Sequence, residues 1–366
     1  MDIKFINLDR QYELIKQSVD ENIKAVHSHG HYILGPEVAE LEVKLADRAG
    51  VTHCIATSNG TDGLLVALMA LGIGPGDEVI VPGFTFIAPV EAVCLLGAKP
   101  VFIDVEVGGC NIDVSKLEKG FSRNTKAIIA VSLYGACAEF DEINALAKKY
   151  GVPVIEDAAQ SFGATYKNSK SCGLTDIAVT SFFPSKPLGC YGDGGAIFTN
   201  NDELAHIIRQ ITVHGQETRY CHTRLGVNAR LDTIQAAILL AKLDVFDQEI
   251  EKRHELAMRY NELLDTCGAI ELPQVPPHCK SVYAQFTVKL ADRDRVADRM
   301  KASGAPTAVH YPLPAYKQPA YRQEGLSFPV SEMLAERVMS IPICPYMTSQ
   351  EQLFVCETLV DAIKGS

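Results

Sequence analysis

A lysine in a polar turn and an aspartate at the end of an apolar run could together act on a carbonyl compound. Lys186 stands in Ser181-Phe-Phe-Pro-Ser-Lys-Pro-Leu-Gly-Cys-Tyr-Gly-Asp-Gly-Gly195, between two prolines and before a glycine cluster. Asp157 follows Glu156 at the end of the mostly apolar run 152–156. A lysine that holds a cofactor as a Schiff base must be fixed in place yet exchange its imine with an incoming amine. Pyridoxal 5′-phosphate also needs an acid at its ring nitrogen, and Asp157 is the candidate.

The segment Ser58-Asn-Gly-Thr61 follows an apolar run and opens a helical pattern. Free N–H groups and the helix dipole favour an anion at such a point, so the backbone of Gly60 and Thr61 could hold a phosphate. An ordinary capped helix start is the commoner meaning of the same pattern. The spacing fits neither a Walker loop nor the dinucleotide fingerprint.

Other candidates each have a structural alternative. Gln160 could hydrogen-bond a ring hydroxyl or lie on the surface, and Phe86 could stack on a ring or belong to the core. Asp157 itself could be a cap or an ion-pair partner. The polar candidates for substrate contacts are His214, His222, His310, Arg224 and Arg230. The histidines lack metal-ligand spacing, so no metal site is predicted.

Short apolar runs alternate with helical patterns through the first two thirds of the chain. We expect strands at 53–57, 78–82, 100–104, 127–133, 152–156, 178–183 and 195–199, and helices at 61–70, 89–96 and 140–149. This alternation predicts an α/β fold with a mostly parallel sheet between helices. Ligands of such sheets bind beyond the carboxyl ends of the strands. The candidates follow those ends, so one pocket at one sheet edge is predicted.

The last third of the chain predicts a smaller α+β unit. One or two helices are expected over 231–260, strands at 281–290 and 306–311, and helices at 293–303 and 331–339. We expect a large domain over residues 1–250, whose N-terminal segment could pack on the small domain, and a small domain over 251–366.

The composition restricts the partners. The 366 residues are 47% hydrophobic and 22% charged, with a net charge of −11. This charge argues against a nucleic-acid partner, although a local basic pocket could still hold a small anion. The 11 cysteines form no C-x-x-C pair, the start lacks a signal-peptide layout, and no apolar run could span a bilayer. A cytoplasmic enzyme without a membrane partner is expected.

Motifs along nearly the whole chain resemble the DegT/DnrJ/EryC1/StrS family of sugar aminotransferases, which have the aspartate aminotransferase (fold type I) architecture. The matching segments are His31-Tyr-Ile-Leu-Gly-Pro-Glu-Val, Ser58-Asn-Gly-Thr-Asp, Pro75-Gly-Asp-Glu-Val, Glu156-Asp-Ala-Ala-Gln, Ser181-Phe-Phe-Pro-Ser-Lys and Asn228-Ala-Arg-Leu-Asp. The resemblance implies a large domain that binds pyridoxal 5′-phosphate, with pyridoxamine 5′-phosphate as its aminated form, and a small C-terminal domain.

The resemblance also implies roles for matching positions. Lys186 would bind the cofactor covalently and move protons, and Asp157 would pair with its ring nitrogen. Gln160 would contact the ring oxygen, and Phe86 would stack on the ring, where relatives often have Tyr or Trp. The phosphate contacts would be Gly60, Thr61, Ser181 and, from the neighbouring subunit of a homodimer, Asn228. The substrate contacts would be Arg230, His310 and Tyr311.

Several stretches, including 181–196 and Thr307-Ala-Val-His-Tyr-Pro, resemble the branch that aminates C3 of a UDP-linked 2-acetamido-2-deoxy-3-oxo-glucuronic acid for lipopolysaccharide O-antigen biosynthesis. L-glutamate would be the amino donor. The alternatives are amination at C4 or C3 of another nucleotide-linked keto-sugar, a sugar dehydratase, and a regulator that binds the cofactor without turnover. Some relatives that act as dehydratases have histidine in place of the lysine, so Lys186 favours transamination.

Overall fold

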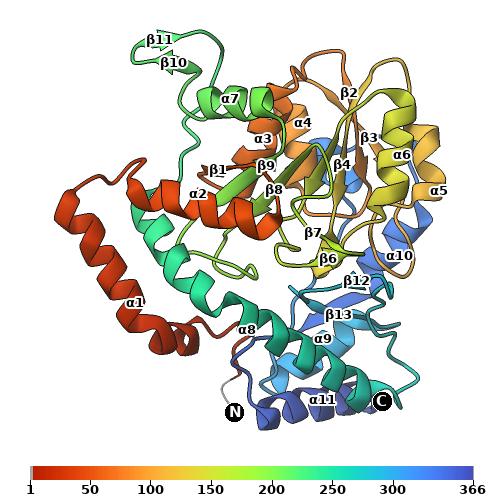
Figure 1. Ribbon diagram of the computed structural model, residues 1–366. Coiled ribbons are helices and arrows are strands. Elements are labelled where there is room, and N and C mark those ends of the chain that lie inside the picture. Colours follow the sequence, from red (N-terminus) through yellow and green to blue (C-terminus); the bar gives the residue numbers. More distant parts are fainter. Residues whose placement is uncertain (1–2, 366) are drawn as a thin grey trace.

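A seven-stranded sheet forms the centre of the large part of the chain (Figure 1). The computed structural model describes residues 3–365. The strand order is β1 (His53–Thr57), β9 (Gly195–Thr199), β8 (Ile177–Ser181), β5 (Val154–Asp157), β4 (Thr125–Val131), β2 (Glu78–Pro82) and β3 (Lys99–Ile103). Strand β9 runs antiparallel to the other six, which are parallel to one another. The predicted α/β fold with a mostly parallel sheet is confirmed.

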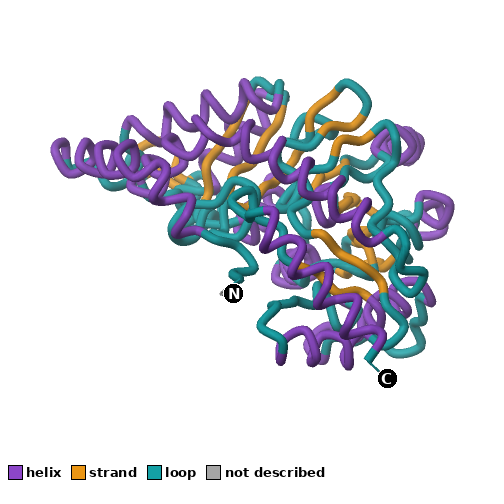
Figure 2. The backbone as a smooth tube through the Cα atoms, turned by 90° about the horizontal axis from the view of Figure 1, so that it is seen from below, coloured by secondary structure: helices purple, strands orange, loops and turns teal. Residues whose placement is uncertain are grey.

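Helices cover both faces of this sheet, as the view from below also shows (Figure 2). One face packs on α3 (Gly60–Ala70), α4 (Ala88–Leu95) and α7 (Asp202–Ile211). The other packs on α2 (Pro36–Ala49), α6 (Phe140–Tyr150) and the long helix α8 (Thr233–Leu264). Neighbouring strand residues point to opposite faces, so Val79 joins the first core and Ile80 the second. Burial on both faces explains why these strands are mostly apolar and do not alternate with polar residues.

The smaller unit lies below the large sheet, near both chain ends (Figure 1). Its antiparallel strands β13 (Phe286–Lys289) and β14 (Val338–Ile341) share a core with α9 (Arg293–Ala302), α11 (Ser349–Lys364) and the end of α8. The predicted strand at 306–311 is wrong, because only Ala308 makes a ladder bridge there, to Ser340. Pro306 and Pro312 lack the N–H that a ladder needs.

The predicted boundary near residue 250 falls inside α8, which runs on to Leu264. Beyond it, the segment that includes α10 (Pro329–Arg337) returns to the large sheet, where Tyr316 packs in the core beside Phe102. The division at residue 250 therefore stays a prediction, and the two units share one long helix.

Helix α1 (Leu8–His29) packs along α8 through Ile15 and Val19. The remaining elements are short: α5 (Val114–Leu117), the hairpin β10 (Gln216–Thr218) and β11 (Cys221–His222), and the three-stranded sheet of β12 (Cys279–Lys280), β6 (Thr165–Tyr166) and β7 (Ser169–Lys170). Of the helices within residues 3–365, none combines enough length with enough hydrophobicity to span a bilayer.

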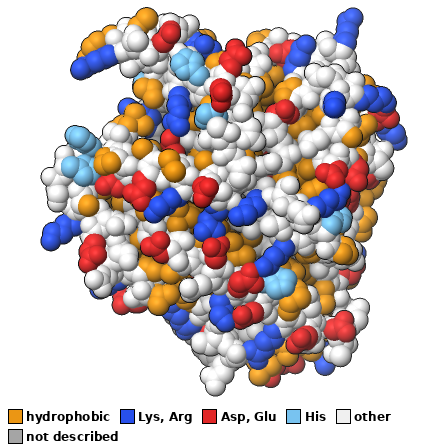
Figure 3. Space-filling model, in the orientation of Figure 1, with side chains coloured by type: hydrophobic (Ala, Val, Ile, Leu, Met, Phe, Trp, Pro, Cys, Tyr) orange, Lys and Arg blue, Asp and Glu red, His pale blue; other side chains and the backbone are white. Residues whose placement is uncertain are grey.

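Charged side chains of both signs are interspersed on the face shown in Figure 3. Lysines and arginines alternate there with aspartates and glutamates, and no continuous basic patch covers this face. This pattern agrees with the net charge of −11.

Glu351 ties the start of the chain to its last helix. Its carboxylate accepts two hydrogen bonds from Arg10, at 2.7 and 2.8 Å, and completes a capping box with Thr348 at the start of α11. The Arg10 bonds hold the pKa of Glu351 at about 2, below the usual 4.5. The pair therefore contributes its full stability above pH 4.5 and loses it as the pH falls towards 2.

Glu351→Gln is expected to lower the free energy of unfolding by about 1 kcal/mol at neutral pH, because an ion pair and part of a cap are weakened. The difference from the native chain should shrink as the pH falls below 4.5. Urea unfolding at a series of pH values measures it, with the exposed Glu357→Gln on the same helix as control. A difference that does not change with pH would contradict the assignment.

Candidate functional site

One cavity of about 600 Å³ opens where the carboxyl ends of β5 and β8 meet the start of α3. This size is typical of a small-molecule site. Of the predicted site residues, its lining contains Gly60, Thr61, Phe86, Asp157, Gln160, Ser181, Lys186, His310 and Tyr311. The single pocket predicted at one sheet edge is present.

The start of α3 forms one wall of the cavity. Asn59 caps the helix by accepting a hydrogen bond of 2.8 Å from the N–H of Asp62. The N–H groups of Gly60 and Thr61 belong to the first turn, which has no intrahelical acceptors for them. Ser181 pairs with Gly195 across the sheet, and a Cβ on Gly195 would lie 2.6 Å from the carbonyl carbon of Asn59. Glycine therefore lets the helix start approach the end of β8 as an anion site requires.

Asp157 is the last residue of β5 and is buried. Its carboxylate accepts a hydrogen bond of 3.0 Å from the N–H of Ala159. Burial raises the pKa of Asp157, while this N–H and the charge of Lys186 lower it. A buried carboxylate with few hydrogen-bond partners can form an ion pair with a cationic group of a ligand.

Gln160 is buried beside the cavity rather than on the surface. Its Oε1 accepts a hydrogen bond of 2.6 Å from the N–H of Tyr134, and its Nε2 donates to the hydroxyl of Tyr311 at 3.3 Å. These two bonds fix which end of the amide faces each neighbour.

Lys186 lies in the loop that follows β8. Its backbone N–H donates to the Phe183 carbonyl at 2.8 Å, which closes a tight turn. Burial lowers the pKa of the Lys186 ammonium, and the opposing effect of Asp157 is smaller. A lysine with a lowered pKa supplies more of the free amine that nucleophilic chemistry needs.

Aromatic side chains form the outer part of the cavity. The rings of Phe86 and Tyr311 lie 5.7 Å apart, and Phe86 is half exposed. Burial and the charge of Lys186 lower the pKa of His310 to about 4, so its imidazole is neutral at neutral pH. The His310 Nδ1 lies 3.0 Å from the Ser340 hydroxyl. His310 therefore offers a hydrogen bond to a ligand and not a positive charge.

Asn228 and Arg230 lie outside the cavity of their own chain. The Nε of Arg230 donates to the Oδ1 of Asn228 at 2.8 Å, and Asn228 is exposed. His214, His222 and Arg224 are also absent from the cavity lining and belong to the region of the β10–β11 hairpin, which projects from the large unit (Figure 1).

Residues 13–360 match the DegT/DnrJ/EryC1/StrS aminotransferase family. The chain belongs to this family. It is 55% identical over 98% of its length to the whole of a Pseudomonas aeruginosa protein named UDP-2-acetamido-2-deoxy-3-oxo-D-glucuronate aminotransferase. It is 40% identical over 99% of its length to 98% of a Geobacillus stearothermophilus protein named pleiotropic regulatory protein.

A solved structure of a DegT/DnrJ/EryC1/StrS aminotransferase from Brucella abortus is 42% identical, and all of each chain superposes with a TM-score of 0.95. The structure of S. venezuelae DesV in complex with a ketimine intermediate is 36% identical, with a TM-score of 0.96 over 99% of each chain. The resemblance seen in the sequence motifs is therefore confirmed, and the chain is an aminotransferase.

Two polar side chains of the cavity had no role assigned from the sequence, although Thr85 closely follows the expected strand at 78–82. Among the described residues, the Oγ1 of Thr85 and the Oε1 of Gln285 are buried and have no hydrogen-bond partner, although both residues line the cavity. A buried polar atom without a partner is costly unless a ligand or water satisfies it. The sequence did contain a signal for Gln285. Polar residues alternate with apolar ones at Ser281, Gln285 and Thr287, and all three are buried in the structure.

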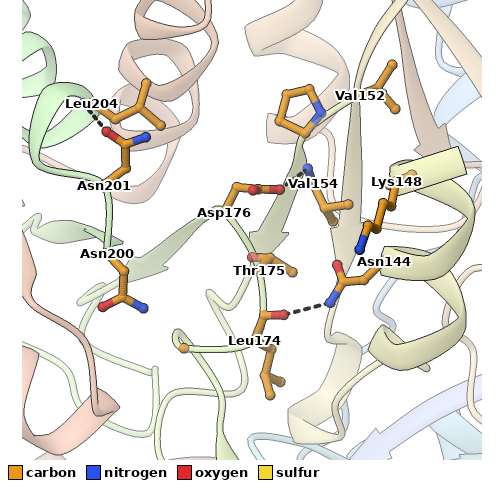
Figure 4. Close-up of a pocket in the computed structure, with 13 residues that line it drawn as sticks. Asn144, Lys148, Val152, Val154, Leu174, Thr175, Asp176, Asn200, Asn201 and Leu204 are labelled. Atoms are coloured by element: carbon orange, nitrogen blue, oxygen red, sulfur yellow. Dashed lines mark hydrogen bonds between the residues drawn. The ribbon is translucent and has the colours of Figure 1, made fainter. Parts of the chain in front are cut away.

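A larger cavity of about 750 Å³ lies at the opposite edge of the sheet, at the amino ends of β5 and β8 (Figure 4). Its asparagine, threonine and aspartate side chains already bond the protein. Asn144 donates to the Leu174 carbonyl at 2.8 Å, and Asp176 accepts from the Val154 N–H at 3.0 Å. Ligands of open α/β sheets bind at the carboxyl ends, which favours the smaller cavity as the candidate site.

Proposed function

We propose that this aminotransferase uses pyridoxal 5′-phosphate to transfer the amino group of L-glutamate to C3 of UDP-2-acetamido-2-deoxy-3-oxo-glucuronic acid. The observation that carries the proposal is the meeting of Lys186, Asp157 and the start of α3 in one cavity. The choice of sugar rests on the relative of that name, which is 55% identical over nearly the whole chain. The cofactor is supported by a 32% identical structure of Bacillus subtilis NtdA with bound pyridoxamine phosphate.

The residues present fit the cofactor. Lys186 supplies an amine with a lowered pKa for its carbonyl carbon, and the start of α3 supplies N–H groups for its phosphate. Asp157 supplies a buried carboxylate for its ring nitrogen. The unpartnered Oγ1 of Thr85 agrees with a cavity built to hold a polar ligand.

The bound cofactor supplies an electron sink that makes the Cα–H of an amino acid acidic. Lys186 has two tasks in the proposal. Its Nζ would hold the cofactor covalently until an incoming amine takes its place. The freed Nζ would then act as general base and then as general acid, taking a proton from one carbon and returning it to another. The lowered pKa of Lys186 favours the free amine for this work.

Asp157 would keep a negative charge at the ring nitrogen, where burial strengthens the interaction with a cation. Gln160, held by Tyr134 and Tyr311, would contact the ring oxygen. Phe86 would stack on the ring, and Ser181 would join Gly60 and Thr61 at the phosphate. We further propose that His310, Tyr311 and Arg230 contact the substrate, because guanidinium pairs well with carboxylates and both glutamate and the uronate carry one.

A homodimer with shared sites is part of the proposal, with Asn228 reaching the phosphate from the partner. The exposed Asn228–Arg230 pair, which lies outside the cavity of its own chain, supports it. The exposed side chains of Tyr220 and Leu225 nearby give apolar surface that a second copy could cover. Light scattering that finds a single chain would contradict this proposal. The cytoplasmic setting and the O-antigen pathway stay predictions.

The test of the reaction is a two-step absorbance assay on the purified protein with bound cofactor. L-glutamate should bleach the visible band of the lysine–cofactor link, and 2-oxoglutarate should accumulate in equal amount. A panel of oxo-sugar nucleotides is then added to the bleached protein. The UDP-linked 3-oxo-glucuronate should restore the band fastest.

Other outcomes identify the alternatives. Restoration by a 4-oxo sugar and not by the 3-oxo-glucuronate would overturn the proposed substrate but keep the enzyme class. A protein that binds the cofactor yet does not bleach with any amino donor would be a regulator without turnover, the class suggested by the name of the Geobacillus relative.

A further inference from the structure

A buried lysine on α8 lies beneath the loop that carries Lys186. Lys242 is 1% exposed, and its Nζ donates to the Gly189 carbonyl at 2.6 Å. The same Nζ lies 4.1 Å from the centre of the Tyr191 ring. Gly189 and Tyr191 both follow Lys186 in its loop, so the Lys242 ammonium contacts this loop from the side of α8.

The loop around Lys186 is folded tightly on itself. The N–H of Cys190 donates to the Phe182 carbonyl at 2.8 Å, just as the N–H of Lys186 donates to that of Phe183. A Cβ on Gly189 would lie 2.6 Å from the Phe183 carbonyl oxygen, so only glycine fits at this turn. The turn points the Gly189 carbonyl toward α8, where the carbonyl accepts the hydrogen bond from Lys242.

A second contact with α8 holds the same loop. The N–H of Tyr191 donates to the Oε1 of Gln235 at 2.9 Å. Gln235 and Lys242 are two turns apart on α8. The helix therefore bonds the loop at two points on the same side, a short distance after Lys186.

Burying the charged side chain of Lys242 at this position costs desolvation free energy. Burial lowers its pKa to about 8, while the charge of Glu249 opposes the shift. The side chain is thus charged at neutral pH in spite of its burial, and its bond to Gly189 is charge-assisted and strong. An apolar side chain of similar volume would avoid the desolvation cost, so the charge at this place needs a reason.

We propose that Lys242 is a positioning residue for Lys186, holding the 182–192 loop through the Gly189 carbonyl so that the Lys186 amine stays fixed while it is bound to and released from the cofactor. The proposal rests on the proposed role of Lys186. Without the bond, the turn should open more often, and the freed amine should spend less time in place for proton transfer.

The test compares Lys242→Met with Lys289→Met as a matched control. Lys289 on β13 is also buried, and its Nζ also donates to a backbone carbonyl, that of Val107 at 2.8 Å, away from the Lys186 loop. Both changes remove one buried ammonium and one such bond, and Lys289→Met also removes an ion pair with Glu271, so its loss of stability should be at least as large. A general loss of stability should therefore affect both variants, whereas an effect on the Lys186 loop should appear only in Lys242→Met.

The first readout is amide hydrogen exchange of the cofactor-free protein. The Lys186 and Cys190 amides should exchange about tenfold faster in Lys242→Met and at the native rate in Lys289→Met. The second readout is the pH titration of the visible band in the protein with bound cofactor, whose midpoint should shift in Lys242→Met alone. The third is kcat, which should fall about tenfold with an unchanged KM for glutamate.

Equal exchange rates and equal titration midpoints in the two variants would overturn the proposal, whatever the activity. If Lys242→Met does not fold, Lys242→Gln takes its place, because it keeps an uncharged N–H donor and should give a smaller shift in the same direction. Absence of the visible band in the native protein would instead refute the proposed cofactor, which separates the two failures.

Discussion

Lys186→Ala is expected to lower the turnover rate by about 10⁴-fold or more, because it removes both the covalent link to the cofactor and the group that moves the proton. The variant should still bind pyridoxal phosphate without a covalent bond, through the start of α3 and Asp157. Its visible spectrum should be that of free cofactor. Rates of product formation and spectra of the dialysed protein measure both effects.

The loss should not reflect unfolding. Within the described residues, the Lys186 Nζ makes no hydrogen bond or ion pair that holds the fold, and its loop is closed by backbone bonds that alanine keeps. Thermal unfolding of the cofactor-free variant should therefore match the native chain. The charge-preserving control is Lys186→Arg, which stays protonated and cannot act as a base, so it should be as inactive as the alanine variant. Multiple turnovers by either variant would refute the role of Lys186.

The sequence could predict the sheet because its strands are buried on both faces. The run that ends at Asp157 and the run 195–199 are mostly apolar, and both form strands that are fully buried in the structure. Periodicity could not show that β9 is antiparallel, since direction depends on the path of the connecting loop. Val338 and Met339 were predicted as the end of a helix but begin β14, because a short apolar run suits either element until its partner strand is known.

The cavity was predictable where its residues end a strand, as Asp157 does, or lie in the loop after one, as Lys186 does. Thr85 also closely follows a strand, but no role could be assigned to it or to Gln285, because their lack of a hydrogen-bond partner appears only in the folded structure. Lys242 was hidden for a similar reason. It stands in an apolar helix pattern, and nothing in that pattern shows that its ammonium meets the carbonyl of Gly189.

Asp157→Asn is expected to lower kcat by about 10²- to 10³-fold, the usual cost of removing one fixed electrostatic partner from a buried site. The amide keeps the shape of the carboxylate but not its charge, so the ring nitrogen would lose the anion that holds its proton. The free energy of unfolding should stay the same or rise, because burial already disfavours the charged form and raises the pKa of Asp157.

The adjacent residue provides the control. Glu156 is also buried on β5, but it points to the other face, where its carboxylate accepts from the Ser132 hydroxyl at 3.0 Å, the Ser171 hydroxyl at 2.7 Å and the Cys172 N–H at 2.8 Å. Glu156→Gln should therefore lower the free energy of unfolding and leave the turnover of the folded enzyme nearly unchanged. Asp157→Asn should thus lower activity without lowering stability, and Glu156→Gln should do the reverse. If both variants lose activity in proportion to their loss of stability, Asp157 is a structural carboxylate and its role at the cofactor is refuted.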